Sequence, residues 1–418
     1  MRIAFLILRK NYYRLLGPAV DEALARGHAV SCWHDWSGPR NGAKGSEFPD
    51  AAPAFRAGAP AVVSYQGRAD LAARWRVDPP DAVVSIDPPD PDVRAAVKTR
   101  WVWLQYGADI LFQQTPRGIA DADAVALYGT HWMRMVEERF AAGLAPELRR
   151  KAVVVGAPEL DALATIDRAL VRQRLGLPAD RPVVLYLPFP LRSNVPTPWL
   201  RNVHAPATRA AQILRTLVAG PRAYWPDARG GRNDRRVVEA MRSFCDAGGA
   251  LLVMKARGKD PVPRYAERLA DRVLYDPSHY PPTILELLSI ASLCVHFYST
   301  AVLEAAAASV PSLCLAPRAP ELGPASFGFA FVHNGEPGGL YNVPGVAYWR
   351  PLAQAFDALA GWRLGDFPLE PGARRGYVER FLGGADGRAS ARLLDLVERV
   401  VEGGGLDAAA PARSAARP

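Results

Sequence analysis

The sequence of 418 residues predicts an α/β protein with two doubly wound parallel-sheet domains that face a central cleft. Two observations support this prediction. Short apolar runs bounded by turn residues alternate with amphipathic stretches along the chain, as strands and helices alternate around a parallel sheet. The length also exceeds the roughly 250 to 300 residues at which a single core stops growing, so we expect two domains.

The first half opens with a predicted strand, helix and strand. RIAFLIL (2–8) is the first strand, LLGPAVDEALARG (15–27) is a helix that ends at Gly27, and HAVSCW (28–33) is the next strand. Further strands are predicted at 82–86, 101–105, 124–128 and 152–156, and a helix at 129–141. The opening order of strand, helix and strand is typical of a βαβ unit.

The second half repeats the pattern after a helical connector near residues 161–175. Strands are predicted at 182–188, 250–256, 272–276, 293–297 and 311–317, and helices at 234–248 and 283–291. We therefore expect an N-terminal domain over 1–165 and a C-terminal domain over 166–385. A helix follows at 386–402, and the Gly- and Ala-rich tail at 403–418 is expected to be disordered.

The composition is that of a soluble globular protein, with 49% hydrophobic and 22% charged residues. The formal net charge of +9 favours anionic partners such as nucleotides or phosphorylated substrates. The arginines are scattered and no zinc-finger, RRM or helix-turn-helix motif is present, so nucleic acid is not an expected partner.

The cysteine spacing and the apolar runs predict the compartment. Cys32, Cys245, Cys294 and Cys314 lie far apart without CxxC spacing, which favours free thiols in a reducing cytosol. The apolar run at the N-terminus is too short for a signal peptide, and no segment approaches the roughly 20 apolar residues of a membrane span. We expect a cytoplasmic protein with, at most, a peripheral contact at the inner membrane face.

A single carboxylate interrupts the apolar run that follows a predicted strand, in HFYSTAVLEAAAASVPSLCLAP (296–317). Ligands of open α/β sheets bind at the carboxyl ends of strands, where Ser299 or Thr300 can cap a helix whose free amides suit a phosphate. Glu304 lies four residues after Thr300, whereas a capping box needs three. The spacing favours a carboxylate that binds the vicinal hydroxyls of a ribose over one that only supports the helix cap.

This segment, YSTAVLEAAAASVP (298–311), resembles the nucleotide-binding C-terminal half of GT-B glycosyltransferases. GAPELDAL (156–163) resembles the GxPxxDxL segment of surface-polysaccharide transferases and UDP-N-acetylglucosamine 2-epimerases. RPVVLYLPFPLRSN (181–194) and LLVMKARGKD (251–260) are similar to segments of CDP-glycerol glycerophosphotransferases. The resemblance covers roughly residues 124–317 and implies a GT-B fold with two Rossmann-like domains. It also implies that the helix at 386–402 packs back on the N-terminal domain.

The chain departs from the glycerophosphotransferases at two histidines. Those enzymes carry one histidine in a WHG segment and another in an HP segment, where this chain has LQYG (104–107) and KARG (255–258). The departure favours transfer of a sugar over transfer of glycerophosphate on the same scaffold.

Besides the Ser-Thr pair and Glu304, three more side chains are predicted to bind the nucleotide-activated donor. Lys255 and Arg257 follow a strand and are predicted to neutralise a diphosphate leaving group, which metal-independent GT-B enzymes need; the alternative is a solvated basic turn. Tyr280, before the helix TILELLSIA, is predicted to contact the nucleotide base, the alternative being only the start of that helix.

A sugar transfer that inverts the anomeric centre needs a general base on the acceptor side. Asp109 in QYGADI lies where the resemblance places the histidine-bearing loop and is our first candidate; Asp87 in SIDPPDPD is the second. We interpret the DPPDPD run as a proline-braced loop and not as a metal-binding DxD motif.

The loop after the first strand is the predicted acceptor site. Arg9, Lys10 and Arg14 in RKNYYR are predicted to hold an anionic acceptor, with a basic start of the following helix as the alternative. His34 and His131 lack partners at ligand spacing, so no metal site is expected. The tryptophans, among them Trp101 and Trp103, fit core packing better than sugar stacking.

The leading hypothesis is a metal-independent glycosyltransferase without a cofactor, which uses a nucleotide-activated sugar as substrate. Its acceptor would be a bacterial cell-envelope polysaccharide or a lipid-linked glycan. The alternatives are a CDP-glycerol-type glycerophosphotransferase, a UDP-N-acetylglucosamine 2-epimerase-like enzyme and a non-catalytic nucleotide-binding module.

Overall fold

The computed structural model describes nine stretches of the chain: 1–37, 52–107, 117–139, 145–188, 234–256, 264–274, 280, 282–316 and 336–403. The chain divides into two compact units. The first unit comprises residues 1–165, 279–281 and 378–418, and the second comprises 166–278 and 282–377. The chain returns to the first unit at Val378, ahead of the boundary at residue 385 that the sequence predicts.

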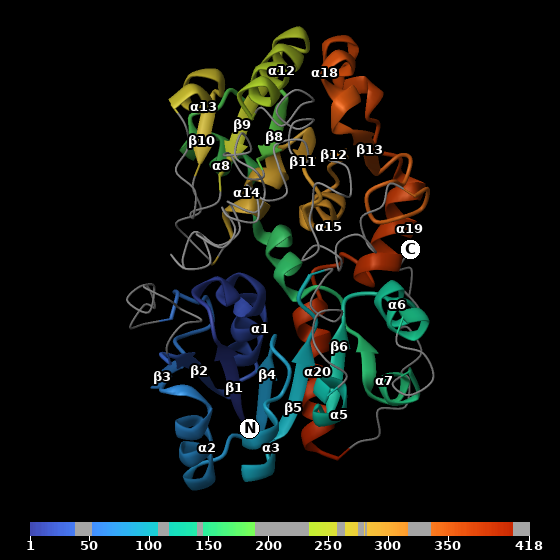
Figure 1. The fold of residues 1–418 in the computed structure, drawn as a ribbon. Coiled ribbons are helices and arrows are strands. Elements are labelled where there is room, and N and C mark those ends of the chain that lie inside the picture. The colour runs from blue at the N-terminus through green and yellow to red at the C-terminus, as the bar shows by residue number, and fades with distance from the viewer. Residues whose placement is uncertain are drawn as a thin grey trace, which may run out of the picture. The chain divides into compact units, whose positions relative to one another are not determined.

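A seven-stranded parallel sheet forms the centre of the first unit, in the order β3-β2-β1-β4-β5-β6-β7 (Figure 1). The strands are β1 (Arg2–Ile7), β2 (Ala29–Asp35), β3 (Ala61–Tyr65), β4 (Ala82–Ser85), β5 (Arg100–Leu104), β6 (Ala124–Leu127) and β7 (Ala152–Val154). Every residue of β4 and of β6 is buried, because strands inside a parallel sheet are covered on both faces. The strand order reverses between β1 and β4.

Helices cover both sides of this sheet. They are α1 (Tyr13–Ala25), α2 (Gly67–Val77), α3 (Pro91–Ala96), α5 (Arg117–Asp121), α6 (Thr130–Arg139), α7 (Ala145–Lys151) and α20 (Ala389–Val401), with the 3-10 segments η1 (Lys10–Tyr12) and η5 (Pro158–Thr165). The DPPDPD run starts a helix: Asp90 accepts hydrogen bonds from the backbone N–H groups of Asp92 and Val93, and Pro91 takes the first helical position.

The helix α20 comes from the end of the chain and packs against α1 and against strands β4 to β6 of the first sheet (Figure 1). Its apolar face, which includes Leu393, Leu396 and Val400, is buried. The backbone N–H groups of Ala389 and Ser390 donate to the two carboxylate oxygens of Asp161, at 3.0 and 2.6 Å. Asp161 of the GAPELDAL segment therefore caps a helix that lies more than two hundred residues later in the sequence.

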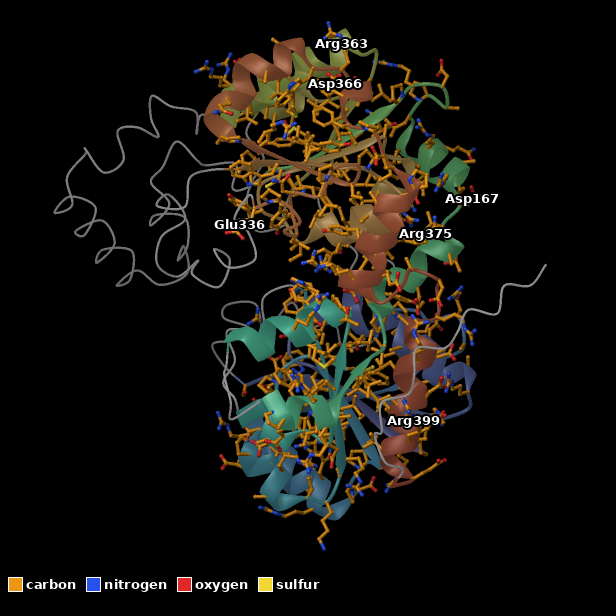
Figure 2. The ribbon with its side chains drawn as sticks, turned by 90° about the vertical axis from the view of Figure 1, so that its right-hand side faces the viewer. Asp167, Glu336, Arg363, Asp366, Arg375 and Arg399 are labelled. Atoms are coloured by element: carbon orange, nitrogen blue, oxygen red, sulfur yellow. The ribbon has the colours of Figure 1, made fainter. Side chains whose placement is uncertain are left out.

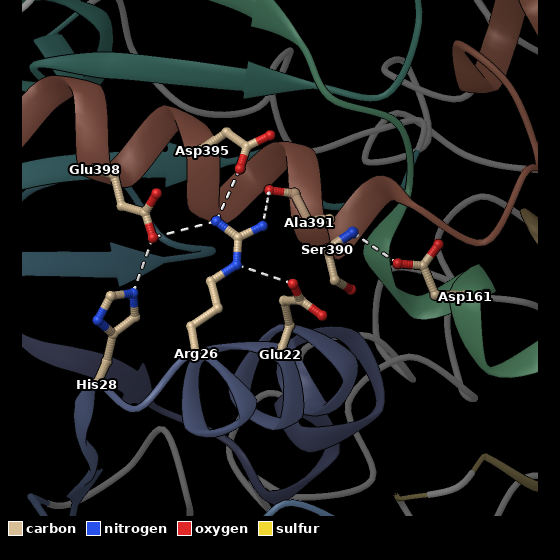
Figure 3. Close-up of polar contacts among 8 residues, drawn as sticks. All are labelled: Glu22, Arg26, His28, Asp161, Ser390, Ala391, Asp395 and Glu398. Carbon is tan, nitrogen blue, oxygen red and sulfur yellow. Dashed lines mark hydrogen bonds and ion pairs between the residues drawn. The ribbon is translucent and has the colours of Figure 1, made fainter.

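A group of charged side chains along α20 attaches this helix to the end of α1 and to the turn before β2 (Figure 3). Arg26 donates to Glu22 at 2.9 Å, to Asp395 at 2.8 Å and to the carbonyl oxygen of Ala391 at 3.0 Å. The imidazole of His28 lies 2.9 Å from the Glu398 carboxylate. One guanidinium thus ties two helices of the first unit together.

The second unit contains a six-stranded parallel sheet in the order β10-β9-β8-β11-β12-β13. The strands are β8 (Val183–Leu187), β9 (Leu251–Lys255), β10 (Arg272–Leu274), β11 (Leu293–His296), β12 (Ser312–Ala316) and β13 (Ala347–Pro351). The helices are α8 (Arg168–Leu175), α12 (Asp234–Ala247), α13 (Arg264–Leu269), α14 (Thr283–Ile290), α15 (Ala301–Ala307), α18 (Leu352–Gly361) and α19 (Pro371–Leu382), with the 3-10 turn η8 (Leu364–Asp366). The last turns of α19 belong to the first unit.

The side chains of this second sheet alternate between two layers. Val295, Leu313 and Leu315 pack into an apolar core with residues of α12 and α18. Their neighbours in the strands, among them His296 and Cys314, point to the opposite face, where α14 and α15 contact the strands. Charged side chains such as those of Arg363, Asp366 and Arg375 are exposed on the outside of the unit (Figure 2).

The predicted fold class is confirmed: the chain is α/β, with two parallel sheets and interleaved helices. Two strands were missed, β3 and β13, and each lies at an edge of its sheet. All four cysteines are buried free thiols. None of the described helices is long and apolar enough to cross a membrane.

Candidate functional site

Each sheet has one place where its strand order reverses, and the loops at the carboxyl ends of the strands diverge there to leave room for a ligand. In the first sheet the reversal lies between β1 and β4, and in the second between β8 and β11. The loops after β1, β4 and β11 carry most of the predicted site residues that lie in the described stretches.

A tyrosine and an aspartate meet at the reversal in the first sheet. The hydroxyl of Tyr12, which follows β1, donates to the Oδ2 atom of Asp87, which follows β4, at 2.7 Å. Burial and the neighbouring Asp87 raise the pKa of Tyr12 well above its usual value, so the phenol stays protonated and donates. The other carboxylate oxygen of Asp87 has no hydrogen-bond partner among the described residues.

Buried tryptophans hold the backbone that carries Asp87. The Ser85 hydroxyl donates to the carbonyl oxygen of Asp87 at 2.6 Å and accepts from the Trp101 indole at 2.7 Å. The Trp103 indole donates to the carbonyl oxygen of Ile86 at 2.8 Å. Trp101 and Trp103 are 1% exposed, so they belong to the core. Their hydrogen bonds orient the backbone around Asp87 from the buried side.

Of the three basic residues predicted to bind the acceptor, Arg9 and Lys10 lie between β1 and α1, and Arg14 lies in the first turn of α1. Arg9 is exposed, and its charge acts on Tyr12, whose pKa it lowers slightly against the larger effect of burial. Lys10 begins η1. Arg14 is half-buried in α1, close enough to Tyr128 for its charge to act on that phenol. Tyr106, which follows β5, packs against Tyr12 with ring centroids 6.1 Å apart.

A second tyrosine and carboxylate pair lies at the ends of β6 and β7. The Tyr128 hydroxyl donates to Glu159 at 2.6 Å, and both residues are buried. The backbone N–H of Tyr128 donates to the Gln105 side chain at 3.0 Å, and Gln105 donates in turn to the carbonyl oxygen of Gly107 at 2.8 Å. Gln105 and Gly107 belong to the LQYG segment, so this network holds the backbone where the resembling families carry their WHG histidine.

The predicted donor residues of the second unit lie around the loop after β11. Thr300 is the N-cap residue of α15, and the hydroxyl of Ser299, one residue earlier, accepts from the backbone N–H of Ala301 at 3.2 Å. The hydroxyl of Thr300 makes no cap hydrogen bond, and α15 has no capping box. Glu304, half-buried one turn into α15, makes no hydrogen bond or ion pair with any residue that the structure describes.

The helix α15 is held in position at both of its ends. Arg374 of α19 donates to the carbonyl oxygens of Ala306 and Ala307 at 2.7 and 2.8 Å, which satisfies the last turn. The alanines of its run are buried, so α15 lies close to the sheet. Because α15 has only seven residues, its dipole is small, and an anion here would depend mainly on hydroxyls, amides and cations. Lys255 is the half-buried last residue of β9, two strands from β11.

Tyr280 groups with the first unit. Its ring packs against Phe55 with centroids 5.2 Å apart, and its hydroxyl donates to Asp21 at 3.0 Å. A Cβ atom on Gly17 of α1 would lie 2.3 Å from the Tyr280 ring, so a glycine is needed there. The contact of Tyr280 with a nucleotide base stays a prediction, and its hydroxyl is already engaged by Asp21.

Two predicted site residues, Asp109 and Arg257, lie outside the described residues. Within the described stretches, no group of three or more His, Cys, Asp or Glu side chains is arranged to hold a metal ion. His34 makes a buried hydrogen bond, since its Nε2 atom lies 2.6 Å from the Tyr13 hydroxyl. Burial lowers the pKa of His34 to about 4.

Four further residues shape these loops and are not predicted from the sequence: Tyr12, Glu159, His296 and Cys314. Tyr12 lies inside the RKNYYR segment, in which the basic residues are the more evident binding candidates. Glu159 lies inside GAPELDAL, and its burial at 6% exposure has no signature in sequence. His296 and Cys314 looked like ordinary residues of buried strands, and only the hydrogen bonds of the next loop reveal their use.

No family model matches this chain, and no curated protein matches its sequence significantly. Solved structures do match. The wall teichoic acid polymerase TagF is 12% identical with a TM-score of 0.56, over 96% of this chain and 89% of that one. The chain has the GT-B fold.

Two further GT-B structures agree with this assignment. The UDP-GlcNAc 2-epimerase from Neisseria meningitidis, bound to UDP-GlcNAc, is 10% identical with a TM-score of 0.56, over 96% of this chain and all of that one. A putative UDP-N-acetylglucosamine 2-epimerase from Listeria monocytogenes is 13% identical with a TM-score of 0.53, over 96% and 97% of the two chains. The resemblance drawn from the sequence motifs is therefore confirmed at the level of fold.

Proposed function

We propose that this chain is a metal-independent transferase that moves a glycosyl group from a nucleotide-activated donor to a cell-envelope polysaccharide or lipid-linked acceptor. The observation that carries the proposal is Glu304. A half-buried carboxylate behind a Ser-Thr loop, at the carboxyl edge of a doubly wound sheet, makes no hydrogen bond or ion pair with the described residues. Such a group is suited to accept hydrogen bonds from the two hydroxyls of a ribose.

The donor phosphates are assigned to the loop after β11. The hydroxyl of Thr300 is not used to cap α15 and can donate to a phosphate oxygen, with Ser299 beside it. Lys255 and Arg257 supply positive charge to the diphosphate as it leaves, in place of a metal ion. Tyr280 is retained as a predicted contact of the base.

The acceptor is assigned to the carboxyl edge of the first sheet. Asp109 or Asp87 takes the proton from the acceptor hydroxyl as its oxygen bonds to the anomeric carbon. The bond between that carbon and the phosphate oxygen breaks, and the nucleoside diphosphate leaves with the electron pair. Asp87 is oriented for this role, because Tyr12 occupies only one of its two oxygens. Arg9, Lys10 and Arg14 supply positive charge for an anionic acceptor.

A screen of activated donors tests this proposal. UDP-, CDP-, GDP- and ADP-sugars and CDP-glycerol are first ranked by the rise that each produces in the thermal unfolding midpoint, since a ligand of the native state stabilises it. The stabilising donors are then incubated with and without a lipid-linked or polysaccharide acceptor. A transferase releases nucleoside diphosphate only when the acceptor is present.

The other outcomes of the screen identify the rivals. Conversion of UDP-N-acetylglucosamine to its epimer without an acceptor would make the chain an epimerase. Release of CMP from CDP-glycerol would make it a glycerophosphotransferase. Binding without turnover of any donor would make it a nucleotide-binding module, and absence of binding would overturn the proposal.

A further inference from the structure

The loop that follows β11, residues 297–300, has a strained conformation at its centre. Tyr298 has a φ of 38°, in the left-handed region that a bulky side chain rarely adopts. Such a residue is strained and persists only where its surroundings hold it. The loop therefore needs contacts that specify this turn, and the same turn determines where Ser299, Thr300 and Glu304 lie.

Two side chains of the underlying strands provide these contacts. The backbone N–H of Ser299 donates to the Nδ1 atom of His296 at 3.3 Å, and the N–H of Tyr298 donates to the sulfur of Cys314 at 3.4 Å. His296 ends β11, and Cys314 lies directly beside it in the register of β12. Both residues are buried, at 0% and 1% exposure. Two adjacent side chains of the sheet thus each accept one backbone N–H of the loop.

The imidazole of His296 is neutral, as a ring must be if its Nδ1 atom is to accept a hydrogen bond. Burial lowers its pKa to about 3, so the ring is neutral at physiological pH. Because Nδ1 accepts from Ser299, the proton of the neutral ring lies on Nε2. Nε2 is buried and has no hydrogen-bond partner in the stretches that the structure describes. Nδ1 is therefore the nitrogen whose hydrogen bond links His296 to the loop.

Aromatic contacts hold the side chain of Tyr298 on the same face. Its ring meets that of Tyr341 edge to face, with centroids 5.5 Å apart, and its hydroxyl accepts from the Trp349 indole at 3.4 Å. The Tyr341 ring also lies 5.6 Å from the His296 ring. Since Trp349 is the register partner of Cys314 in β13, three neighbouring strands contribute to one loop conformation.

We propose that His296 is a positioning residue for nucleotide binding, which acts through Nδ1 on the Ser299 amide, with Cys314 as its partner on the Tyr298 amide. This inference rests on the proposed function of the loop. His296 does not touch the nucleotide; it holds the turn that places Thr300 and Glu304 for the phosphate and the ribose. Without the acceptor at Nδ1, the strained turn relaxes and the ligand must restore it on binding, which weakens affinity.

Two isosteric replacements separate this role from others that His296 could have. In His296→Asn the amide oxygen takes the place of Nδ1 and still accepts from Ser299. In His296→Gln the amide takes the place of Nε2 and the acceptor at Nδ1 is lost. We measure the dissociation constant of the nucleoside diphosphate that binds best among UDP, CDP, GDP and ADP, together with the thermal unfolding midpoint of each variant.

We expect His296→Asn to bind within about threefold of the wild type and His296→Gln to bind at least about tenfold more weakly, a difference of about 1.4 kcal/mol. Cys314→Ser should retain binding, because a hydroxyl also accepts, and Cys314→Ala should weaken it. A general loss of stability would affect Asn and Gln alike. Equal affinities of the Asn and Gln variants, or tighter binding by Gln, would overturn the proposal.

Hydrogen exchange of the peptide that contains residues 297–300 tests the loop without any ligand. Its exchange should accelerate in His296→Gln and stay as in the wild type in His296→Asn. If the wild type binds none of the four nucleotides, the proposed function fails, while this exchange experiment still decides whether His296 holds the loop. Equal exchange in both variants would refute the positioning role on its own.

Discussion

Carboxylates near the strand ends of the two units have different partners. Among the described residues of the first unit, Asp87 accepts a tyrosine hydroxyl from Tyr12 at 2.7 Å, Glu159 from Tyr128 at 2.6 Å and Asp21 from Tyr280 at 3.0 Å. In the second unit the hydroxyls of Tyr348 and Tyr377 donate to backbone carbonyl oxygens instead. Glu304 there makes no hydrogen bond or ion pair with a described residue.

This difference separates two uses of a carboxylate. A phenol that donates to one oxygen orients the carboxylate without cancelling its charge. Such a carboxylate can still react through its other oxygen, and its hydrogen bond also stabilises the fold. A carboxylate without a partner among the described residues, such as Glu304, contributes little to their packing, and we propose that it binds a ligand. Loss of Asp87 or Glu159 should therefore affect the structure or the chemistry of the first unit, and loss of Glu304 mainly the affinity for a ligand.

The largest effect is expected from Asp87→Asn. If Asp87 is the general base, kcat of the transfer should fall by about 10² to 10⁴, because the amide cannot accept the proton. The amide oxygen still accepts from Tyr12, so the thermal unfolding midpoint should change little. Asp90→Asn in the same segment is the control, since asparagine caps a helix equally well. A kcat for Asp87→Asn within threefold of the wild type would assign the base to another residue.

Asp161→Ala should destabilise the first unit. It leaves the backbone N–H groups of Ala389 and Ser390 without an acceptor inside the protein, which costs about 2 to 3 kcal/mol of unfolding free energy. Urea denaturation measures the loss. Asp386→Asn is the control, because Asp386 is exposed and accepts from Arg388 and Arg392 at the same end of α20. Equal losses of unfolding free energy in the two variants would show that the hydrogen bonds of Asp161 to α20 stabilise the unit no more than an exposed carboxylate does.

Glu304→Gln should weaken nucleotide binding with little change in stability. Loss of the charge that accepts two ribose hydroxyls should raise the dissociation constant about tenfold, or about 1.4 kcal/mol. The unfolding midpoint without ligand should stay unchanged, because Glu304 has no described partner to lose. Glu239→Gln, an exposed site on α12, is the control. Unchanged affinity for UDP, CDP, GDP and ADP would remove Glu304 from the ligand site.

The smallest effect concerns the pH dependence of stability. Burial holds the pKa of His296 at about 3 in the folded protein, below its ordinary value of 6.5. The unfolded chain therefore takes up a proton below pH 6.5 that the native state refuses, and the contribution of His296 to stability declines as the pH falls from 6.5 toward 3. Between pH 7 and 5.5 this decline amounts to about 1 kcal/mol.

His296→Asn removes this titrating group, so its unfolding free energy should fall by about 1 kcal/mol less than that of the wild type over the same pH range. Urea denaturation at pH 7 and at pH 5.5 measures the difference. Part of the decline should remain, because burial also lowers the pKa values of His34 and His131 in the first unit, each to about 4. Identical pH dependence in variant and wild type would show that His296 is not a buried neutral imidazole.

The sequence determined the fold class because buried strands of a parallel sheet have a plain pattern. AVVS and LCVH are covered on both faces and appear as short apolar runs. The two missed strands, β3 and β13, lie at sheet edges, where AVVSY is partly exposed and AYWRP ends in proline. Edge strands need less apolar surface, so their pattern is weaker.

The sequence also predicted which loops could form a ligand site, because the carboxyl end of a strand can be located without knowing the sheet order. Ser299, Thr300 and Glu304 after one strand, and Asp87 after another, follow from that reasoning. Only the tertiary structure decided which side chains meet. Tyr12 reaches Asp87 across 75 residues and Asp161 reaches Ser390 across 229, and hydrogen bonds over such separations depend on strand order and helix packing that no local pattern encodes. The same holds for His296 and Cys314, whose use became visible when the register placed them side by side beneath a strained turn.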